Sequence, residues 1–181
     1  MNRSEGEQVA ASSAALPLTE GLSQLFGEHH RRVLKAAYRI TGNMADAEDV
    51  AQAVFLRLAN AGGPVTNAGS YLYRAAINGA LDLLRGRKAA STEPLELAAG
   101  VASTDRGSSP ENEVSSRELG DFLRMAIAEL PARAAEMFTL RYVEELGNRE
   151  IAALIGTSQA VVAVTLFNAR AKLKKRLREW E

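Results

Sequence analysis

The sequence predicts an all-α protein of two small helical domains joined by a flexible linker, the second of which contains a helix-turn-helix. Apolar residues recur at spacings of three and four along most of the chain, and no segment shows the alternation that a strand requires. A stretch rich in serine, glycine, proline and acidic residues interrupts this period between the two halves. The 181 residues suffice for one ordinary domain or two small ones.

The first block is expected to hold three or four helices. Residues 1–17 are rich in alanine, serine and glutamate without any period, and we expect them to be disordered. Thr19 is placed to cap the first helix, which ends at Gly42. The second helix begins near Asp46, and the glycine, proline and asparagine content of residues 60–70 predicts a loop.

The third helix of this block carries a row of polar side chains in the sequence SYLYRAAINGALDLLRGRK, residues 70–88. At 3.6 residues per turn, the row is one narrow stripe made of Tyr71, Arg74, Asn78, Asp82 and Arg85. The opposite side is apolar and is expected to face the core. The stripe favours a binding surface. The alternative is that it is an ordinary helix face exposed to solvent.

A second block of four helices follows an acidic linker. Pro131 is expected in the first turn of one helix, Asn148 and Ser158 are expected to cap the last two, and Gly156 separates these two. We therefore divide the chain into a disordered segment, a first domain, a linker and a second domain, at residues 1–17, 18–88, 89–113 and 114–181.

The composition excludes several classes of site. The chain has no cysteine and two histidines, so we expect no disulfide, no metal and no cofactor. No apolar run approaches the roughly 20 residues that cross a bilayer, and the first residues lack the pattern of a secretory signal. We therefore expect a cytoplasmic protein without membrane insertion. Paired carboxylates, a nucleophile with its base, or a phosphate-binding glycine loop are not found at a usable spacing, which argues against an enzyme.

The formal net charge of zero argues against an indiscriminate nucleic-acid binder, but the charges are unevenly distributed. Residues 19–88 hold nine basic and six acidic side chains, and residues 114–181 hold eleven and nine. Residues 89–113 hold one basic and five acidic side chains. Two mildly basic blocks are thus joined by an acidic connector.

The last part of the chain has the layout of a helix-turn-helix, in the sequence NREIAALIGTSQAVVAVTLFNARAKLKKRL. The first helix would brace the second, whose outer face is then free for the major groove of DNA. That face offers the amides of Gln159 and Asn168 for bidentate base contacts, whereas Val161 and Val164 beside them are apolar. A plain packing hairpin of helices is the alternative to DNA binding.

In order and spacing, these segments resemble a bacterial sigma factor of the extracytoplasmic-function (ECF) group, from about residue 18 to residue 178. The first block is similar to the N-terminal domain of that family in LFGEHHRRVLKAAYRITGN, DAEDVAQAVFLRL and SYLYRAAINGALDLLRGRK. The second is similar to its C-terminal domain in LPARAAEMFTLRYVEELGNREIAALIGTS and LFNARAKLKKRL. The resemblance implies a protein that binds core RNA polymerase and directs it to promoter DNA.

The resemblance further implies that the third helix holds the non-template strand of the melted minus-ten element. Tyr71 takes the place of a common tryptophan and would stack on an unpaired base, and Asn78 matches an asparagine near a flipped base. Basic groups would meet phosphates, and Asp82 would support them. The expected minus-ten residues are Tyr71, Arg74, Asn78, Asp82, Arg85, Arg87 and Lys88.

A docking site for the clamp helices of RNA polymerase is implied on the second helix. It would consist of Asp46, Glu48, Asp49, Gln52, Phe55 and Leu56. A polar face mixed with exposed apolar area suits a protein interface, and acidic groups in a first turn also compensate the helix dipole. Ala53 stands where the family usually has a glutamate, which removes one expected contact.

The final helix is expected to enter the major groove at the minus-thirty-five element. The expected contacts come from Arg149, Thr157, Ser158, Gln159, Thr165, Asn168, Arg170 and Lys172. Ala163 and Asn168 stand where basic residues are common, which predicts weaker binding or a different upstream sequence. The acidic linker would lie in the positively lined channel of the polymerase, and an anti-sigma factor is expected to mask the binding surfaces.

Two alternatives differ in what the second block binds. A sigma-like interaction module would bind a protein through the apolar side chains of Val161, Val164 and Phe167. A stand-alone helix-turn-helix regulator would bind duplex DNA tightly without any polymerase. Footprinting with the reconstituted holoenzyme distinguishes the first alternative from a sigma factor, and a duplex-binding measurement without polymerase tests the second.

Overall fold

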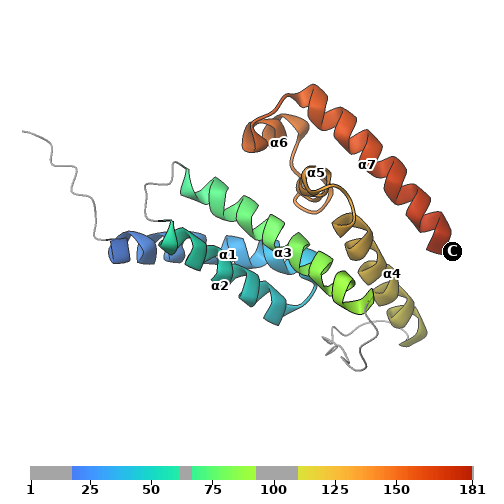
Figure 1. Cartoon of the computed structure of the whole chain (residues 1–181), viewed down its shortest axis with the longest axis horizontal. Coiled ribbons are helices and arrows are strands. Elements are labelled where there is room, and N and C mark those ends of the chain that lie inside the picture. Colours follow the sequence, from blue (N-terminus) through green and yellow to red (C-terminus); the bar gives the residue numbers. More distant parts are fainter. Residues whose placement is uncertain (1–17, 62–66, 93–109, 181) are drawn as a thin grey trace, which may run out of the picture.

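The computed structural model describes residues 18–61, 67–92 and 110–180, and within these residues the chain forms seven α-helices and no strand. The all-α class predicted from the apolar period is confirmed. The first block consists of α1 (Leu18–Thr41), α2 (Met44–Asn60) and α3 (Ala68–Thr92). The second consists of α4 (Pro110–Ala128), α5 (Ala132–Tyr142), α6 (Asn148–Ile155) and α7 (Gln159–Trp180) (Figure 1).

The first block is a three-helix bundle in which each helix packs on the other two. On α3, the apolar side predicted from the sequence lies in the core, where Leu72, Ala76 and Ala80 are completely buried and Leu84 nearly so. Burial of such side chains is the main favourable term in folding. Because this side faces α1 and α2, the polar stripe of α3 points away from the core of its own block.

Side chains and backbone at the helix ends set where the helices begin. The Asn43 side chain accepts a hydrogen bond from the Asp46 backbone N–H and caps α2. The hydroxyl of Ser158 accepts one from the Val161 N–H at the start of α7, as its position in the sequence predicts. At α6 the N-cap is Gly147 and Asn148 is the first helical residue, so the predicted cap was one residue too late.

The helices extend further into the expected linker than its composition predicts. Helix α3 continues to Thr92, because Ala89 and Ala90 are strong helix formers, and α4 already begins at Pro110. Proline is well tolerated in a first helical turn. The remainder of the expected linker and the expected disordered segment, residues 1–17, lie outside the described residues.

Helices α6 and α7 form the helix-turn-helix. Gly156 ends α6 with a positive φ of 73°, a left-handed conformation that glycine adopts without strain, and the two helix axes are bent by 107°. A crossing near a right angle is typical of this motif. Taken singly, none of the described helices has both the length and the apolar character to cross a bilayer. Among the described residues, α6 and α7 would be long and apolar enough only if counted together, and they are sharply bent relative to each other.

The two blocks pack against each other, with α3 in contact with both α4 and α5. In Figure 1, α2 lies on one side of α3 and α5 on the other, while α7 runs along the far edge of the molecule. The polar stripe of α3 is therefore directed at the second block.

Candidate nucleic-acid interface and docking face

The middle of the α3 stripe is bound by one buried carboxylate of α5. Arg74 donates from Nε to Oε1 of Glu136 at 2.7 Å and from Nη2 to Oε2 at 3.3 Å. Asn78 donates from Nδ2 to the same Oε1 at 3.2 Å. Glu136 is only 5% exposed, so it depends on these donors for its solvation. Two residues expected to contact DNA are thus joined to the protein's own second block.

Two further carboxylates of the second block bind donors of the first. Glu129 pairs with Lys88, and Glu144 accepts from Arg39 at 3.2 Å and from the Tyr73 hydroxyl at 2.7 Å. Each link joins residues more than forty positions apart in the chain, so the contacts hold the blocks together. We call the three acidic side chains that bridge the blocks the carboxylate row, which consists of Glu129, Glu136 and Glu144.

Electrostatics favour the ionised form of one member of this row, Glu129. The hydrogen bond from Lys88 is the main cause that lowers the pKa of Glu129, and burial, followed by the nearby Glu144 carboxylate, raises the pKa of the Tyr73 phenol. A carboxylate with a lowered pKa stabilises the folded arrangement above its ordinary pKa, and that contribution is lost as the pH falls through the lowered value. The Glu129–Lys88 pair therefore holds the blocks together at neutral pH and weakens under acid conditions.

The rest of the stripe is less covered. Tyr71 is 41% exposed at the N-terminal end of α3. Arg85 donates to the Ala128 carbonyl oxygen at 2.7 Å and pairs with the exposed Asp82 at 2.6 Å. Arg87, two residues further on, lies on the opposite side of α3 and pairs with Asp46 of α2, so it stands apart from the other expected minus-ten residues. The others lie on the side of α3 that faces the second block, with the exposed Tyr71 at the start and engaged groups along the middle and end.

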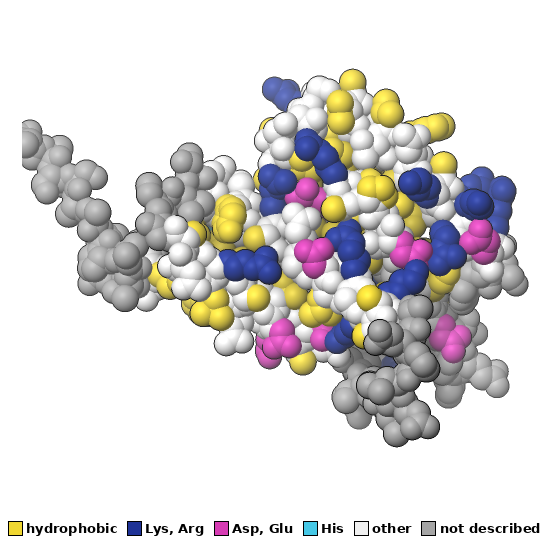
Figure 2. Space-filling view, in the orientation of Figure 1, with side chains coloured by type: hydrophobic (Ala, Val, Ile, Leu, Met, Phe, Trp, Pro, Cys, Tyr) yellow, Lys and Arg dark blue, Asp and Glu magenta, His cyan; other side chains and the backbone are white. Residues whose placement is uncertain are grey.

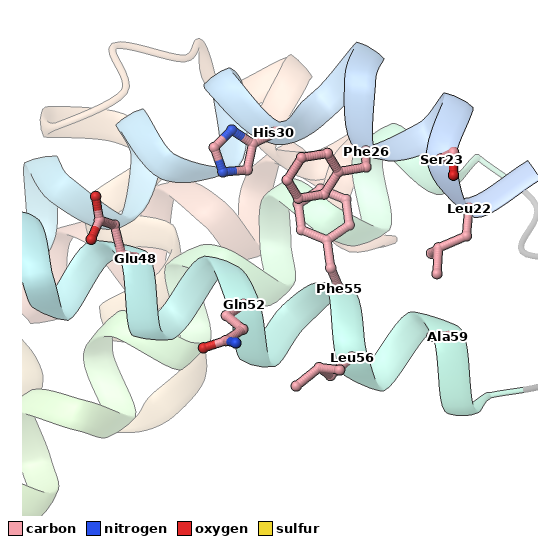
Figure 3. A pocket seen from close by; sticks show the side chains of 9 residues that line it. All are labelled: Leu22, Ser23, Phe26, His30, Glu48, Gln52, Phe55, Leu56 and Ala59. Atoms are coloured by element: carbon pink, nitrogen blue, oxygen red, sulfur yellow. The ribbon is translucent and has the colours of Figure 1, made fainter. Parts of the chain in front are cut away.

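A groove of about 540 Å³ lies between α1 and α2 at the expected docking face (Figure 3). Phe26 of α1 stacks on His30, with ring centroids 4.4 Å apart, and meets Phe55 of α2 with centroids 4.8 Å apart. Leu56 at the rim is 56% exposed. The lining is Leu22, Ser23, Phe26, His30, Glu48, Gln52, Phe55, Leu56 and Ala59.

One residue expected at the docking face lies elsewhere. Asp46 is 6% exposed and bound to Arg87, because it stands in the first turn of α2 where that helix meets the end of α3. Glu48, Asp49 and Gln52 are exposed, as a docking role requires. We therefore assign Asp46 a structural role and leave it out of the docking face.

The outer side of α7 is exposed along its length. Gln159 and Asn168 are open to solvent, as are three basic side chains expected to meet phosphates, Arg149, Arg170 and Lys172. Thr157 and Thr165 are half-buried, and the Ser158 hydroxyl is engaged in its helix cap. Arg149 lies at the start of α6, and Thr157 and Ser158 lie in the turn between the two helices. The other expected minus-thirty-five residues lie on the two flanks of α7, with exposed apolar side chains between them.

The carboxylate row was not predicted from the sequence. Glu136 shares a helical face with Leu140, four residues on, and a carboxylate on a buried face needs a cationic partner. This pattern predicts that Glu136 is buried, yet it does not indicate which donor forms a hydrogen bond with the carboxylate.

Comparison with known proteins assigns both blocks to one family. The Sigma-70 region 2 family model matches residues 25–90, and the Sigma-70, region 4 model matches residues 123–173. The ECF RNA polymerase sigma factor SigW of Bacillus subtilis is 30% identical over 159 residues, which cover 82% of this chain and 84% of SigW. This chain belongs to the ECF sigma factors. It is a promoter-directing sigma factor of RNA polymerase.

A second relative of this ECF sigma factor shows a similar level of identity, and a solved structure shows a lower one. The ECF sigma factor SigE of Mycolicibacterium smegmatis is 32% identical over 170 residues, covering 92% of this chain and 64% of SigE. Among solved structures, the sigma factor RpoE in complex with the anti-sigma factor NepR from Bartonella quintana is 16% identical, with a TM-score of 0.48, and covers 88% of this chain and 98% of that chain.

Replacing Glu136 by glutamine is expected to loosen the contact between the two blocks. The neutral amide leaves the Arg74 guanidinium without its charged partner, a loss of about 1–3 kcal/mol that solvent reduces because Arg74 is partly exposed. The chain has no cysteine, so dyes on cysteines introduced at the exposed Ala53 and Ala171 report the separation of the blocks. Energy transfer should fall in Glu136→Gln.

The matched control for this measurement is Glu28→Gln. It removes the same charge from an exposed contact within α1, where Glu28 accepts a hydrogen bond from Gln24 at 2.9 Å. Energy transfer should be unchanged in this control. Equal transfer in Glu136→Gln and in the control would contradict a structural role for the carboxylate row.

Proposed function

We propose that this ECF sigma factor docks on core RNA polymerase through the α1–α2 groove and holds the melted minus-ten strand on the α3 stripe. Helix α7 then contacts the minus-thirty-five element. The observation that carries this proposal is that the stripe binds anionic oxygens in the structure itself, through Arg74 and Asn78. Phosphate oxygens accept the same charge-assisted hydrogen bonds as carboxylates do.

In the proposed mechanism the two blocks separate before the DNA strand binds. Because Glu136 occupies Arg74 and Asn78, a DNA strand reaches these donors only after α5 has moved away. We call the arrangement with α5 on the stripe the closed arrangement. When the blocks separate, oxygen atoms of the DNA strand replace the Glu136 carboxylate as hydrogen-bond acceptors. The positive charge of the stripe is therefore compensated both in the closed arrangement and in the DNA-bound one.

Two buried polar atoms make the closed arrangement less stable than a fully satisfied interface. Two of the four side-chain atoms that are buried without a hydrogen-bond partner in the described residues, Oε1 of Glu144 and Nη2 of Arg85, belong to side chains that link the blocks. A buried polar atom without a partner costs about 1–3 kcal/mol. The closed arrangement therefore opens at a smaller cost in free energy than its number of ion pairs indicates.

The two ends of the strand-binding site have different roles in this proposal. Tyr71 is exposed even in the closed arrangement, so its ring is available to an unpaired base first. The Asn78 amide becomes free on opening and then hydrogen-bonds a base edge. Basic groups at the end of α3 would follow the phosphates of the strand.

The docking face and the strand-binding face can be occupied together. The groove lies between α1 and α2, whereas the stripe lies on the side of α3 that meets α5 (Figures 1 and 3). An apolar groove with polar groups at its rim, here Glu48 and Gln52, is typical of a protein interface. Polymerase bound at the groove would leave α3 free to engage DNA.

The remaining parts of the proposal concern organisation and partners. We propose the domain boundaries 18–88 and 114–181 with an acidic linker at 89–113, and an anti-sigma factor that masks the binding surfaces, as the resemblance implies. The protein would act in the cytoplasm together with the polymerase. Phosphoryl transfer stays in the polymerase, and this chain contributes binding and strand separation alone.

Replacing Leu56 by glutamate is expected to weaken core polymerase binding by at least tenfold. Leu56 is a large exposed apolar residue at the rim of the groove, and a charge there stays unpaired when the interface desolvates it. The measurement is a titration of labelled sigma factor with core polymerase. Met44→Glu is the control, since Met44 is 48% exposed on the same helix but outside the groove. Equal weakening by both variants would contradict docking at this groove.

Replacing Tyr71 by alanine is expected to reduce open-complex formation by about tenfold to a hundredfold. Stacking of a base on an aromatic ring is worth about 1–3 kcal/mol. Permanganate reactivity of promoter thymines measures melting, with core binding checked in parallel. Tyr38→Ala is the control, because Tyr38 is also 41% exposed but lies on α1. Unchanged melting in Tyr71→Ala would refute the stacking role.

A further inference from the structure

The outward face of α7 is apolar at its centre. Val162, Leu166 and Ala169 are buried against the rest of the second block, so the side opposite them is the one free for a partner. At 100° per residue, that opposite side consists of Ala160, Val164, Phe167 and Ala171, with Val161 beside it. Val161 is 46% exposed, Val164 62% and Phe167 65%. Three large apolar side chains thus stand in solvent where the motif meets the major groove.

Charged side chains around this face favour a polyanion as its partner. Between residues 148 and 176 there are six basic side chains and one acidic one, Glu150. The Glu150 carboxylate is occupied by the Gly147 backbone N–H at 2.7 Å. Figure 2 shows hydrophobic side chains along the edge formed by α7 and basic side chains gathered at the C-terminal end of that helix. The face is therefore a strip of apolar side chains with basic side chains around it.

Only one group in the major groove of DNA is apolar. Each thymine presents a C5-methyl group there, whereas guanine and cytosine present acceptors or donors that an apolar side chain leaves unpaired. An amide beside the strip fits the partner base, because asparagine and glutamine form bidentate hydrogen bonds with adenine N6 and N7. Asn168 is exposed beside the strip, and Gln159 is exposed at the N-terminal end of α7.

We propose that α7 reads thymine methyl groups in the upstream promoter element through Val161, Val164 and Phe167. This inference rests on the proposed contact between α7 and the minus-thirty-five element. It assigns sequence discrimination to apolar contacts, and it leaves the basic side chains to bind phosphates without selecting bases. The positions read by the centre of the helix are A·T pairs with the thymine methyl directed at the strip.

The test uses the holoenzyme and promoters mapped by run-off transcription of genomic fragments. Each thymine of the upstream element is replaced by deoxyuridine on both strands, which removes the methyl groups and preserves every hydrogen bond. Affinity should fall about fourfold for each lost methyl contact, which corresponds to about 0.8 kcal/mol. The same replacement in the spacer between the two elements is the control and should have no effect.

A double-mutant cycle ties the effect to the named side chains. Val164→Ala should weaken binding to the thymine duplex by about fourfold and should cause a smaller loss on the deoxyuridine duplex, because the methyl contact is already absent. Met44→Ala, at an exposed apolar residue on α2, is the matched control and should behave as the wild type on both duplexes.

The outcomes separate this inference from the function on which it rests. An upstream footprint that is insensitive to deoxyuridine, or an upstream element without thymine, overturns methyl readout while leaving promoter contact by α7 intact. Loss of all upstream protection in the wild-type holoenzyme refutes the contact itself. If Val164→Ala weakens core polymerase binding and leaves the footprint unchanged, the strip is a protein-binding surface and methyl readout is wrong.

Discussion

The Glu136 carboxylate is the interaction on which the relation between the two blocks depends. It is almost fully buried, and a buried charge is tolerated only when donors replace the water it has lost. Those donors, Arg74 and Asn78, belong to the other block and lie on the face expected to meet DNA. The same side chains therefore hold the protein closed and, in the proposed function, hold the promoter strand.

This double use follows from the chemistry of the donors. A guanidinium group and an amide N–H donate to oxygen acceptors without distinguishing their source, so an internal carboxylate can take the place of a phosphate at Arg74 and of a base edge at Asn78. Two neighbouring acidic side chains, Glu129 and Glu144, likewise accept hydrogen bonds from donors of the first block and so extend this contact between the blocks. In the proposed function, a chain of zero net charge thus carries a DNA-binding face that is neutralised internally until polymerase and promoter are present.

The helices, the cap at Ser158, the glycine ends of α1 and α6 and the polar stripe of α3 could be predicted from the sequence, because each depends on neighbours within one or two turns. The cap expected at Thr19 was wrong, since α1 already begins at Leu18. The partner of the stripe could not, since Arg74 and Glu136 are 62 residues apart across a linker that has no local pattern. Burial of Asp46 was missed for the same reason, because its partner Arg87 lies on another helix. Placement of the cap at Asn148 was wrong by one residue, since a glycine with extended backbone serves there instead.

The central claim is that the α3 stripe holds an unpaired promoter strand once α5 has moved away. The most direct measurement is the affinity of the holoenzyme for a single-stranded minus-ten oligonucleotide of the non-template strand, with wild-type chain and with Asn78→Ala. Loss of the amide contact to a base edge should weaken binding by about tenfold while core affinity is unchanged. Equal affinity of the two proteins for the oligonucleotide would contradict the account.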